Sequence, residues 1–241
     1  MSRETDREPL YEGIDYAEFW TGPEKAHIDR LEQRVICSLL PGGEAIAEIG
    51  AGFGRLTGSY LGRYARVCLV EPASNMRELL ARDFGDRAEV VDASVYRLPF
   101  GDGQFDGLLM VRVMHHLTEP TAAIAELRRV LRPGGLLLFS YSNKRNLGRV
   151  LRYLVTRRND PFSLDVEAYG ETLFGHHPRR MERWLEEAGF VVERRAGVGL
   201  VGKVVGVLPF LRRVSQPPLF LAMLAGSLEI SPTQFLLVRR R

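Results

Sequence analysis

The 241-residue sequence predicts an α/β fold, a doubly wound sheet of parallel strands with helices on both faces. Short runs rich in Val, Ile and Leu alternate along the chain with longer runs whose apolar residues recur every three to four positions. Strands that follow one another through a helix pair in parallel. A composition of 45% hydrophobic and 26% charged residues is typical of a globular protein and excludes disorder of the whole chain.

Most of the expected sheet lies in the first 141 residues. Strands are predicted at residues 45–50, 66–71, 88–93, 105–111 and 135–141. Helices are predicted at residues 24–40, 57–65, 74–84 and 121–132. The Pro-Gly-Gly triplets at 41–43 and 133–135 are expected to end the first and the last of these helices.

The regular alternation breaks after Tyr141. We expect a basic helix at 146–158, a loop at 161–177, a helix at 178–189 and strands at 190–196 and 233–240. An apolar stretch at 199–228 separates the last two strands. It lines a pocket for a hydrophobic substrate, rests on an anionic membrane surface, or simply covers one face of the sheet.

The cysteines, the apolar stretches and the charge distribution indicate the environment in which the protein works. Cys37 and Cys68 each lie inside an apolar run, so we expect both to be reduced core residues of a cytoplasmic protein. The first thirty residues hold no apolar stretch of signal-peptide length, and the longest apolar stretches, 196–211 and 217–228, are each too short for a bilayer span. The net charge of +3 divides into −5 for residues 1–141 and +8 for residues 142–241.

A glycine-rich turn follows the first predicted strand. Gly50, Gly52 and Gly54 can adopt positive φ and let a ligand lie against bare backbone. A helix beginning near Gly54 would point its positive dipole end at that ligand. The turn alone is weak support for a ligand site, because any tight turn between a strand and a helix also favours glycine.

Acidic residues end the next two strands. Glu71 lies 21 residues after Gly50, where a carboxylate accepts hydrogen bonds from ribose hydroxyls in a doubly wound fold. Asp92, followed by Ala93, is placed to accept from the exocyclic amine of an adenine. Since strand ends form the ligand crevice of an open α/β sheet, these residues together indicate an adenosine-containing ligand.

Two common nucleotide motifs do not match. The dinucleotide fingerprint G-x-G-x-x-G needs a glycine at position 55, where this chain has Arg55. This mismatch weakens the case for NAD or FAD as the ligand. The turn also lacks the G-x-x-x-x-G-K-[ST] pattern of a phosphate-binding P-loop.

Four stretches resemble the class I S-adenosylmethionine-dependent methyltransferases, in particular the methyltransferase-11-like small-molecule group. They are EIGAGFGRLT, VEPASNMRELLA, VVDASVYRLPFGDGQFDGLLMVRVMHHL and EPTAAIAELRRVLRPGGLLLFS, and they cover roughly residues 44–141 in order. HPRRMERWLEEAGFVVE and SPTQFLLVRR resemble the family's last helix and closing strands. The resemblance implies a Rossmann-like, mostly parallel seven-stranded sheet with an antiparallel C-terminal strand. It also implies S-adenosyl-L-methionine as cofactor and S-adenosylhomocysteine as product.

The resemblance also assigns the cofactor residues. Their set is Glu48, Gly50, Ala51, Gly52, Glu71, Pro72, Met76, Asp92, Ala93 and Arg112. Glu48 and the glycine turn would hold the amino-acid end, Glu71 the ribose, and Met76, Asp92 and Ala93 the adenine. Arg112 departs from the family, which more often has a small or polar residue there. A cation beside a sulfonium is unfavourable, so we expect its side chain to turn away or to pair with an acid.

Methyl transfer from a sulfonium needs a general base only if the acceptor must lose a proton. The candidate bases are His116, His115 and His176; the alternative is that the His115–His116 pair only packs at the crevice. Candidate substrate residues are Tyr11, Tyr16, Trp20, Tyr141 and His177. The N-terminal aromatics form a lid or pack on the sheet edge, and His177 can instead cap the helix that begins at Pro178. No metal site is expected.

One domain, residues 1–241, is expected, with a helical cap at 1–40, a cofactor core at 41–141, a substrate cap at 142–177 and a C-terminal part at 178–241. The expected partner is a small-molecule acceptor methylated on O, N or C, and a hydrophobic metabolite is one candidate. MVRVMHH lacks the Asn/Asp-Pro-Pro-aromatic element of DNA amine methyltransferases. The alternatives are a non-catalytic cofactor binder, an RNA methyltransferase using the basic C-terminal part, and a nicotinamide oxidoreductase. A membrane surface is a further candidate partner, and the oligomeric state is open.

Overall fold

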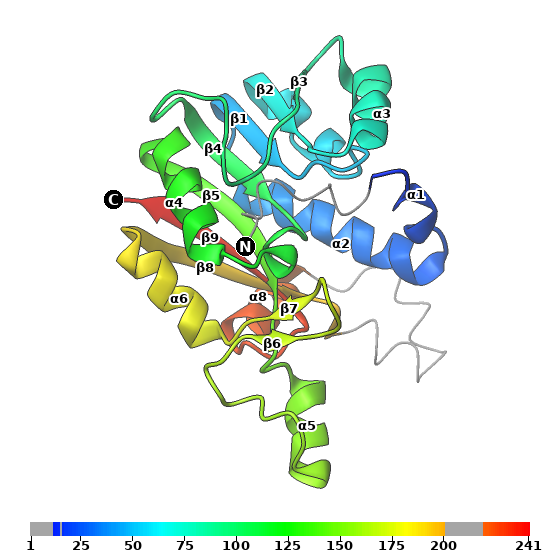
Figure 1. Ribbon diagram of the computed structural model, residues 1–241, viewed down its shortest axis with the longest axis vertical. Helices are drawn as coiled ribbons and strands as arrows, with labels where there is room; N and C mark the ends of the chain where they lie inside the picture. Colours follow the sequence, from blue (N-terminus) through cyan, green and yellow to red (C-terminus); the bar gives the residue numbers. More distant parts are fainter. Residues whose placement is uncertain (1–11, 15, 201–218) are drawn as a thin grey trace.

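A seven-stranded sheet forms the centre of the protein in the computed structural model, which describes residues 12–14, 16–200 and 219–241 (Figure 1). The strand order is β3-β2-β1-β4-β5-β9-β8. The bounds are β1 (Gly43–Ile49), β2 (Tyr64–Val70), β3 (Glu89–Val91), β4 (Phe105–Met110), β5 (Leu131–Ser142), β8 (Phe190–Val198) and β9 (Thr233–Arg240). Only β9 runs antiparallel to its neighbours in this sheet. The predicted fold class is confirmed.

Helices cover both faces of the sheet. They are α1 (Tyr16–Phe19), α2 (Pro23–Leu39), α3 (Ser74–Phe84), α4 (Pro120–Val130), α5 (Leu147–Thr156), α6 (Pro178–Glu187) and α8 (Leu219–Ser227). The buried side chains of α4 and α6 belong to one core cluster, and those of α2, α3 Leu80 and α8 Ala222 to the other. Residues alternate between the clusters along β4, with Leu108 and Met110 in the first and Leu109 in the second.

One expected helix does not form, and another ends earlier than expected. No α-helix forms at 57–65; short 3₁₀ turns at Thr57–Ser59 and Leu61–Arg63 lead directly into β2 at Tyr64. Gly58 and Gly62 lie in this segment, and glycine is an unfavourable helix residue. The dipole of a helix at Gly54 therefore does not contribute to the site.

Helix α4 ends at Val130, before the Pro-Gly-Gly triplet at 133–135, and Leu131 already pairs with Phe105 in the sheet. The residue before a proline is disfavoured in the helical conformation, which limits the helix before Pro133.

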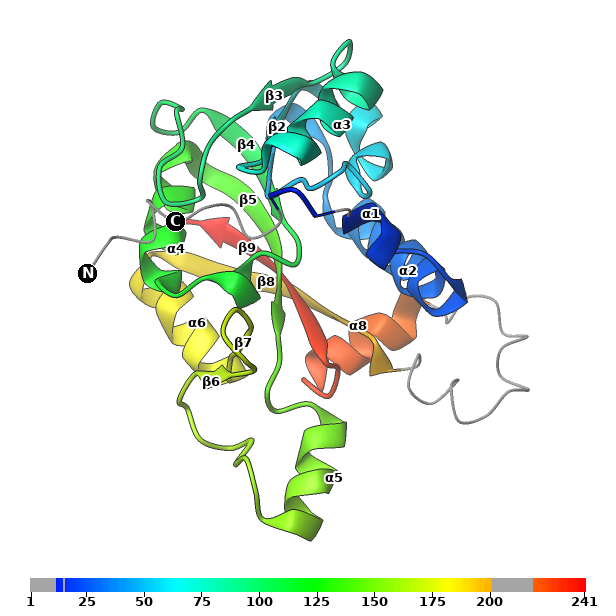
Figure 2. The same cartoon turned by 45° about the vertical axis from the view of Figure 1, so that its right-hand side comes forward.

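The part of the chain between β5 and α6 leaves the sheet. Helix α5 projects away from the body, and the short hairpin of β6 (Glu167–Ala168) and β7 (Phe174–Gly175) returns the chain toward it (Figures 1 and 2). Among the described residues, no helix is both long and apolar enough to cross a membrane.

Helix α8 approaches β8 very closely, and Gly226 makes this possible. A Cβ atom at Gly226 would lie 2.4 Å from the Cα of Ala196, which is backbone and cannot rotate away. A Cβ at Gly148 of α5 would have only the Asn146 side chain near it, at 3.5 Å. Gly226 and Gly148 are thus a crowded and an uncrowded helical glycine, so the same substitution can be compared at both.

We expect Gly226→Ala to lower the free energy of unfolding by about 1–3 kcal/mol, because the added methyl group forces α8 off β8. Gly148→Ala is expected to be neutral or stabilising by up to about 1 kcal/mol, because alanine is the better helix residue. Urea denaturation of both variants checks this. Equal stability of the two would show that α8 does not pack as described.

Candidate functional site

A cavity of about 600 Å³ lies at the edge of the sheet where the parallel strands end. Its walls come from the loops after β1, β2, β3 and β4, from the N-terminal segment, and from the β6–β7 hairpin. Its size falls within the range of small-molecule sites, roughly 300–1,000 Å³. It also lies beside the β1–β4 switch in strand order, where open α/β sheets bind ligands.

All ten residues of the predicted cofactor set line this cavity. They are Glu48, Gly50, Ala51, Gly52, Glu71, Pro72, Met76, Asp92, Ala93 and Arg112. The first and the last of these residues lie 64 positions apart in the sequence, and the fold brings them to the same cavity. The role of each stays a prediction.

The glycine turn after β1 leaves part of its backbone open to the cavity. Gly50 and Gly52 have φ values of 70° and 58°, in the left-handed region that favours glycine. A Cβ at Gly50 would lie 2.3 Å from Val113 Cγ2, so this glycine is needed for packing. A Cβ at Gly52 would meet nothing within 4 Å. The backbone at Gly52 therefore faces open space in the cavity wall, where a ligand can lie against it.

Glu71 joins the first two strand ends. One carboxylate oxygen accepts from the Gly52 amide at 2.8 Å, and the other accepts from the Ala73 amide at 3.0 Å. Burial raises the pKa of Glu71, while these two amide hydrogen bonds oppose the rise. The carboxylate is thus fixed at the cavity wall with lone pairs left for a ligand.

Glu48 is a buried acid in the wall of the cavity. Its carboxylate accepts from the hydroxyls of Thr57, at 2.8 Å, and Tyr60. Burial raises the pKa of Glu48 to about 7, although both hydroxyls and the charge of Arg55 act in the other direction. Near neutral pH this group exchanges between an acid and a carboxylate, and a cation placed beside it would favour the carboxylate.

Asp92 lies at the open end of the cavity. It forms an ion pair with Arg77, at 2.9 Å between Arg77 Nη2 and Asp92 Oδ2, and its side chain is exposed. Arg77 also donates to the backbone oxygens of Glu71 and Pro72, at 3.1 and 2.6 Å. One arginine therefore links the ends of β2 and β3.

The side chain of Arg112 pairs with a buried acid. Its backbone has a φ of 61°, uncommon for a non-glycine residue, and its guanidinium bonds the fully buried Glu32 of α2 at 2.6 and 3.0 Å. Arg55 bonds the other oxygen of Glu32 at 2.7 Å and lies 3.5 Å from the centre of the Trp20 ring. The expected pairing of Arg112 with an acid is present.

Of the three candidate bases, only His116 lines the large cavity. Its Nδ1 lies 2.9 Å from the backbone oxygen of Thr172, an acceptor, so Nδ1 carries the proton and Nε2 the lone pair. Burial lowers the pKa of His116, which keeps the ring neutral near pH 7.

His115 lines a second cavity of about 200 Å³ instead, together with Arg112 and Phe174, which belong to both cavities. Burial lowers the pKa of His115 to about 2.

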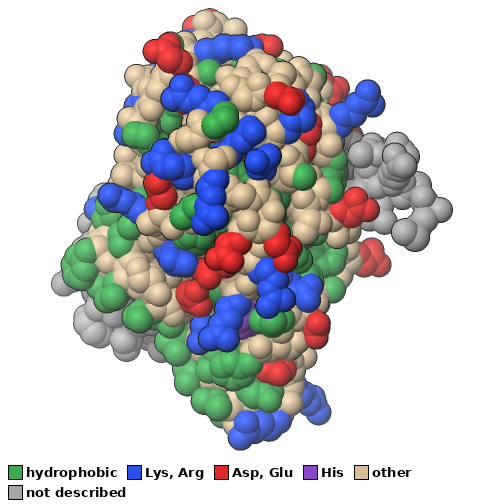
Figure 3. All heavy atoms as spheres, turned by 90° about the vertical axis from the view of Figure 1, so that its left-hand side faces the viewer, with side chains coloured by type: hydrophobic (Ala, Val, Ile, Leu, Met, Phe, Trp, Pro, Cys, Tyr) green, Lys and Arg blue, Asp and Glu red, His purple; other side chains and the backbone are tan. Residues whose placement is uncertain are grey.

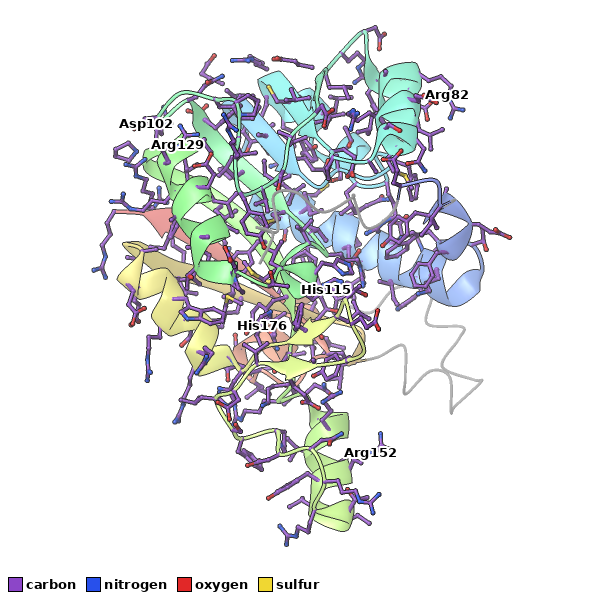
Figure 4. The ribbon with its side chains drawn as sticks, viewed as in Figure 1. Arg82, Asp102, His115, Arg129, Arg152 and His176 are labelled. Carbon is purple, nitrogen blue, oxygen red and sulfur yellow. The ribbon has the colours of Figure 1, made fainter. Side chains whose placement is uncertain are left out.

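Three other predicted residues lie in the protein interior and not in the large cavity. His176 is fully buried against Trp184, with ring centres 5.7 Å apart, and burial lowers its pKa to about 4 (Figure 4). His177 caps α6 by accepting from the Arg179 amide at 3.2 Å. Tyr141 is a core residue of β5. Their burial corrects the expectation that these side chains face a substrate.

The N-terminal aromatics do reach the site. Tyr16 and Trp20 line the cavity, and the Tyr16 ring contacts that of Phe53, on the glycine turn, at 6.2 Å between centres. Tyr11, the remaining candidate, lies outside the described residues.

Several site residues escaped sequence reasoning. Nothing in the sequence marks Glu32 as a site residue, because it is one of many charged residues in a predicted helix. Tyr60 lies in the segment 57–65, where the sequence predicts a helix that does not form. Thr172 and Phe174 belong to a segment that was expected to be a loop, and only the hairpin brings them to the cavity. Among the described residues, no group of three or more His, Cys, Asp or Glu is arranged to hold a metal ion.

Comparison with known proteins shows what this core resembles. Residues 47–139 match the family model described as a methyltransferase domain. This part of the chain is therefore similar to the methyltransferase domain of that family. The match runs from the second half of β1 into β5 and includes every predicted cofactor residue.

Individual relatives differ in the atom that their names say is methylated. An O-methyltransferase of Penicillium expansum is 29% identical over 53% of this chain and 51% of its own length. The ubiquinone/menaquinone biosynthesis C-methyltransferase of Hahella chejuensis is 33% identical over 43% of this chain and 45% of its own length.

A solved structure gives the same fold. The 1,6-didemethyltoxoflavin-N1-methyltransferase of Burkholderia thailandensis, crystallised with bound 1,6-didemethyltoxoflavin and S-adenosylhomocysteine, is 19% identical, with a TM-score of 0.60, and the match covers 88% of this chain and 78% of that one. The chain spans about half the length of the curated relatives that it matches.

The raised pKa of Glu48 predicts how stability varies with pH. The unfolded chain ionises Glu48 near the ordinary value of 4.5, and the folded protein only near 7. The wild type should therefore lose about 3 kcal/mol of unfolding free energy relative to Glu48→Gln as the pH rises between these values. Above this window the difference should stay constant.

Urea denaturation of both proteins over this pH range measures the difference. Glu78→Gln, on the exposed side of α3, is the matched control. A difference between wild type and Glu48→Gln that does not vary with pH would refute the assignment.

Proposed function

We propose that this chain binds S-adenosylmethionine in the large cavity and transfers its methyl group to a small, hydrophobic acceptor. The observation that carries the proposal is the convergence of three acidic strand ends on one cavity beside the open glycine turn at Gly52. The proposal includes the division into a core at 41–141 and caps at 1–40 and 142–177. A cytoplasmic location stays a prediction.

The residues of the cavity fit the cofactor group by group. The Glu48 carboxylate suits the ammonium of the amino-acid end, and the Gly52 backbone can lie along it. Glu71 keeps oxygen lone pairs for the ribose hydroxyls, beside its bonds to Gly52 and Ala73. Met76 gives an apolar surface for the adenine, with Asp92 at its edge. When bound, the cofactor supplies an activated methyl group on its sulfonium.

What the protein contributes to the reaction is mainly position and exclusion of water. Trp20 and Tyr16 from the N-terminal segment and Phe174 from the hairpin close the cavity from two sides. A dry, confined site holds the acceptor in line with the methyl group, and orientation of this kind accounts for much of the rate of a displacement reaction. Glu32 holds Arg112 by an ion pair, which limits its approach to the sulfonium.

The lining of the cavity supports an apolar acceptor. Tyr16, Trp20, Phe53, Val113 and Phe174 supply aromatic and aliphatic walls. Because the named relatives include O-, C- and N-methyltransferases, the acceptor atom is left to experiment.

Calorimetric titration with S-adenosylhomocysteine, with NAD as the control ligand, tests the cofactor. We expect binding of S-adenosylhomocysteine alone, weakened by about 1–3 kcal/mol in Glu71→Ala because a charged hydrogen-bond acceptor is lost. Glu78→Ala, the same substitution on the exposed side of α3, should bind as the wild type does. Binding of NAD, or of neither ligand, would refute the proposal.

An acceptor found by screening small apolar molecules for S-adenosylhomocysteine release allows a test of His116. If Nε2 of His116 removes a proton from the acceptor, His116→Ala should keep the cofactor affinity and lose about 10²–10⁴ in turnover. His116→Asn keeps a donor for Thr172 but no base, so it should be equally slow. Full turnover in His116→Asn would make His116 a positioning residue only.

A further inference from the structure

Helix α5 presents its apolar face to solvent. Leu147, Leu151, Leu154 and Val155 recur at the spacing that places side chains on one side of a helix. All four are exposed; Leu151 and Leu154 are each 54% accessible and Val155 is 85% accessible. No residue of α5 is buried. A helix of a globular protein normally turns such a face inward, so this arrangement is reversed.

The opposite face of α5 is held by the protein. Arg149 forms an ion pair with Glu167 of β6, at 2.7 Å, and lies 4.1 Å from the centre of the Tyr169 ring. Asn146 caps the helix by accepting from the Arg149 amide at 3.2 Å. These contacts fix the rotation of the helix, so the outward direction of its leucines follows from specific bonds.

The segment around α5 is strongly basic. Residues 144–158 contain six Lys or Arg and no Asp or Glu. Arg145 and Arg149 pair inside the molecule, with Glu229 and Glu167. Arg152, Arg157 and Arg158 are exposed. Hydrophobic side chains lie above basic ones at the lower tip of the molecule (Figure 3), and Arg152 lies near this tip (Figure 4).

A second apolar surface lies near the base of α5. Phe220, Leu224 and Leu228 of α8 and its C-terminal turn are exposed. The Leu147 amide donates to the backbone oxygen of Ile230 at 3.0 Å, which joins the start of α5 to the segment that follows α8. Both helices lie in the lower half of the molecule (Figure 2).

We propose that α5 docks the protein on the surface of an anionic lipid bilayer, with its leucine face in the interface and its arginines against the lipid headgroups. An outward apolar stripe bordered by arginine and free of acid is the pattern that binds such surfaces. A second copy of this chain fits less well, because pairing two α5 faces would bring their arginines together. The proposal goes beyond methyl transfer and does not depend on it.

Flotation of the intact protein with vesicles tests this docking. We expect binding to vesicles of phosphatidylcholine with phosphatidylglycerol, little binding to phosphatidylcholine alone, and release at high salt. Leu151→Glu/Leu154→Glu and, separately, Arg152→Glu/Arg157→Glu/Arg158→Glu should each weaken binding at least about tenfold.

The matched control is Arg82→Glu, an exposed arginine of α3 at the end of the molecule opposite Arg152 (Figure 4). It should bind as the wild type does, and thermal unfolding of every variant should match the wild type. Absence of binding, equal binding to both vesicles, or binding that the α5 variants do not change would overturn the proposal. Self-association that the leucine variants abolish, without vesicle binding, would assign the face to a second copy and overturn it as well.

Discussion

The parallel pairing of β1 with β2 on one side and β4 on the other is the constraint on which the site depends. Parallel strands end at the same edge, so the residues after Ile49, Val70 and Met110 meet there. The order of the sheet reverses between β1 and β4, which leaves a crevice between the loops that cross to opposite faces. The predicted cofactor residues that follow β1, β2 and β4 are brought together by this pairing, and the two core clusters pack against opposite faces of the sheet.

Burial of charge is the second organising feature. Glu48, Glu71 and Glu32 are buried acids at or beside the cavity, and each is held by a different kind of partner. Glu71 accepts from backbone amides, Glu48 from hydroxyls, and Glu32 from two guanidinium groups. An unpaired buried carboxylate is costly, so these bonds make the acids tolerable and also fix where they point.

The cavity and helix α5 place their apolar side chains in opposite ways. At the cavity, apolar and polar side chains together line a hollow of about 600 Å³. At α5, apolar side chains face solvent and basic ones surround them. The β6–β7 hairpin connects the two, because Glu167 anchors α5 while Phe174 lines the cavity.

The sequence by itself predicted most of the elements and a set of residues that line one cavity. Periodicity located the strands, and a resemblance carried by residues 44–141 named the set that later met in one cavity, because strand ends and glycine turns are local features with fixed meaning. The tertiary structure decided which histidine reaches the cavity. His115, His116 and His176 look alike in sequence, and only packing against Trp184 or Thr172 separates them. It also decided the partner of Arg112 and the outward face of α5, since both depend on contacts with residues 80 and 18 positions away, which no local pattern encodes.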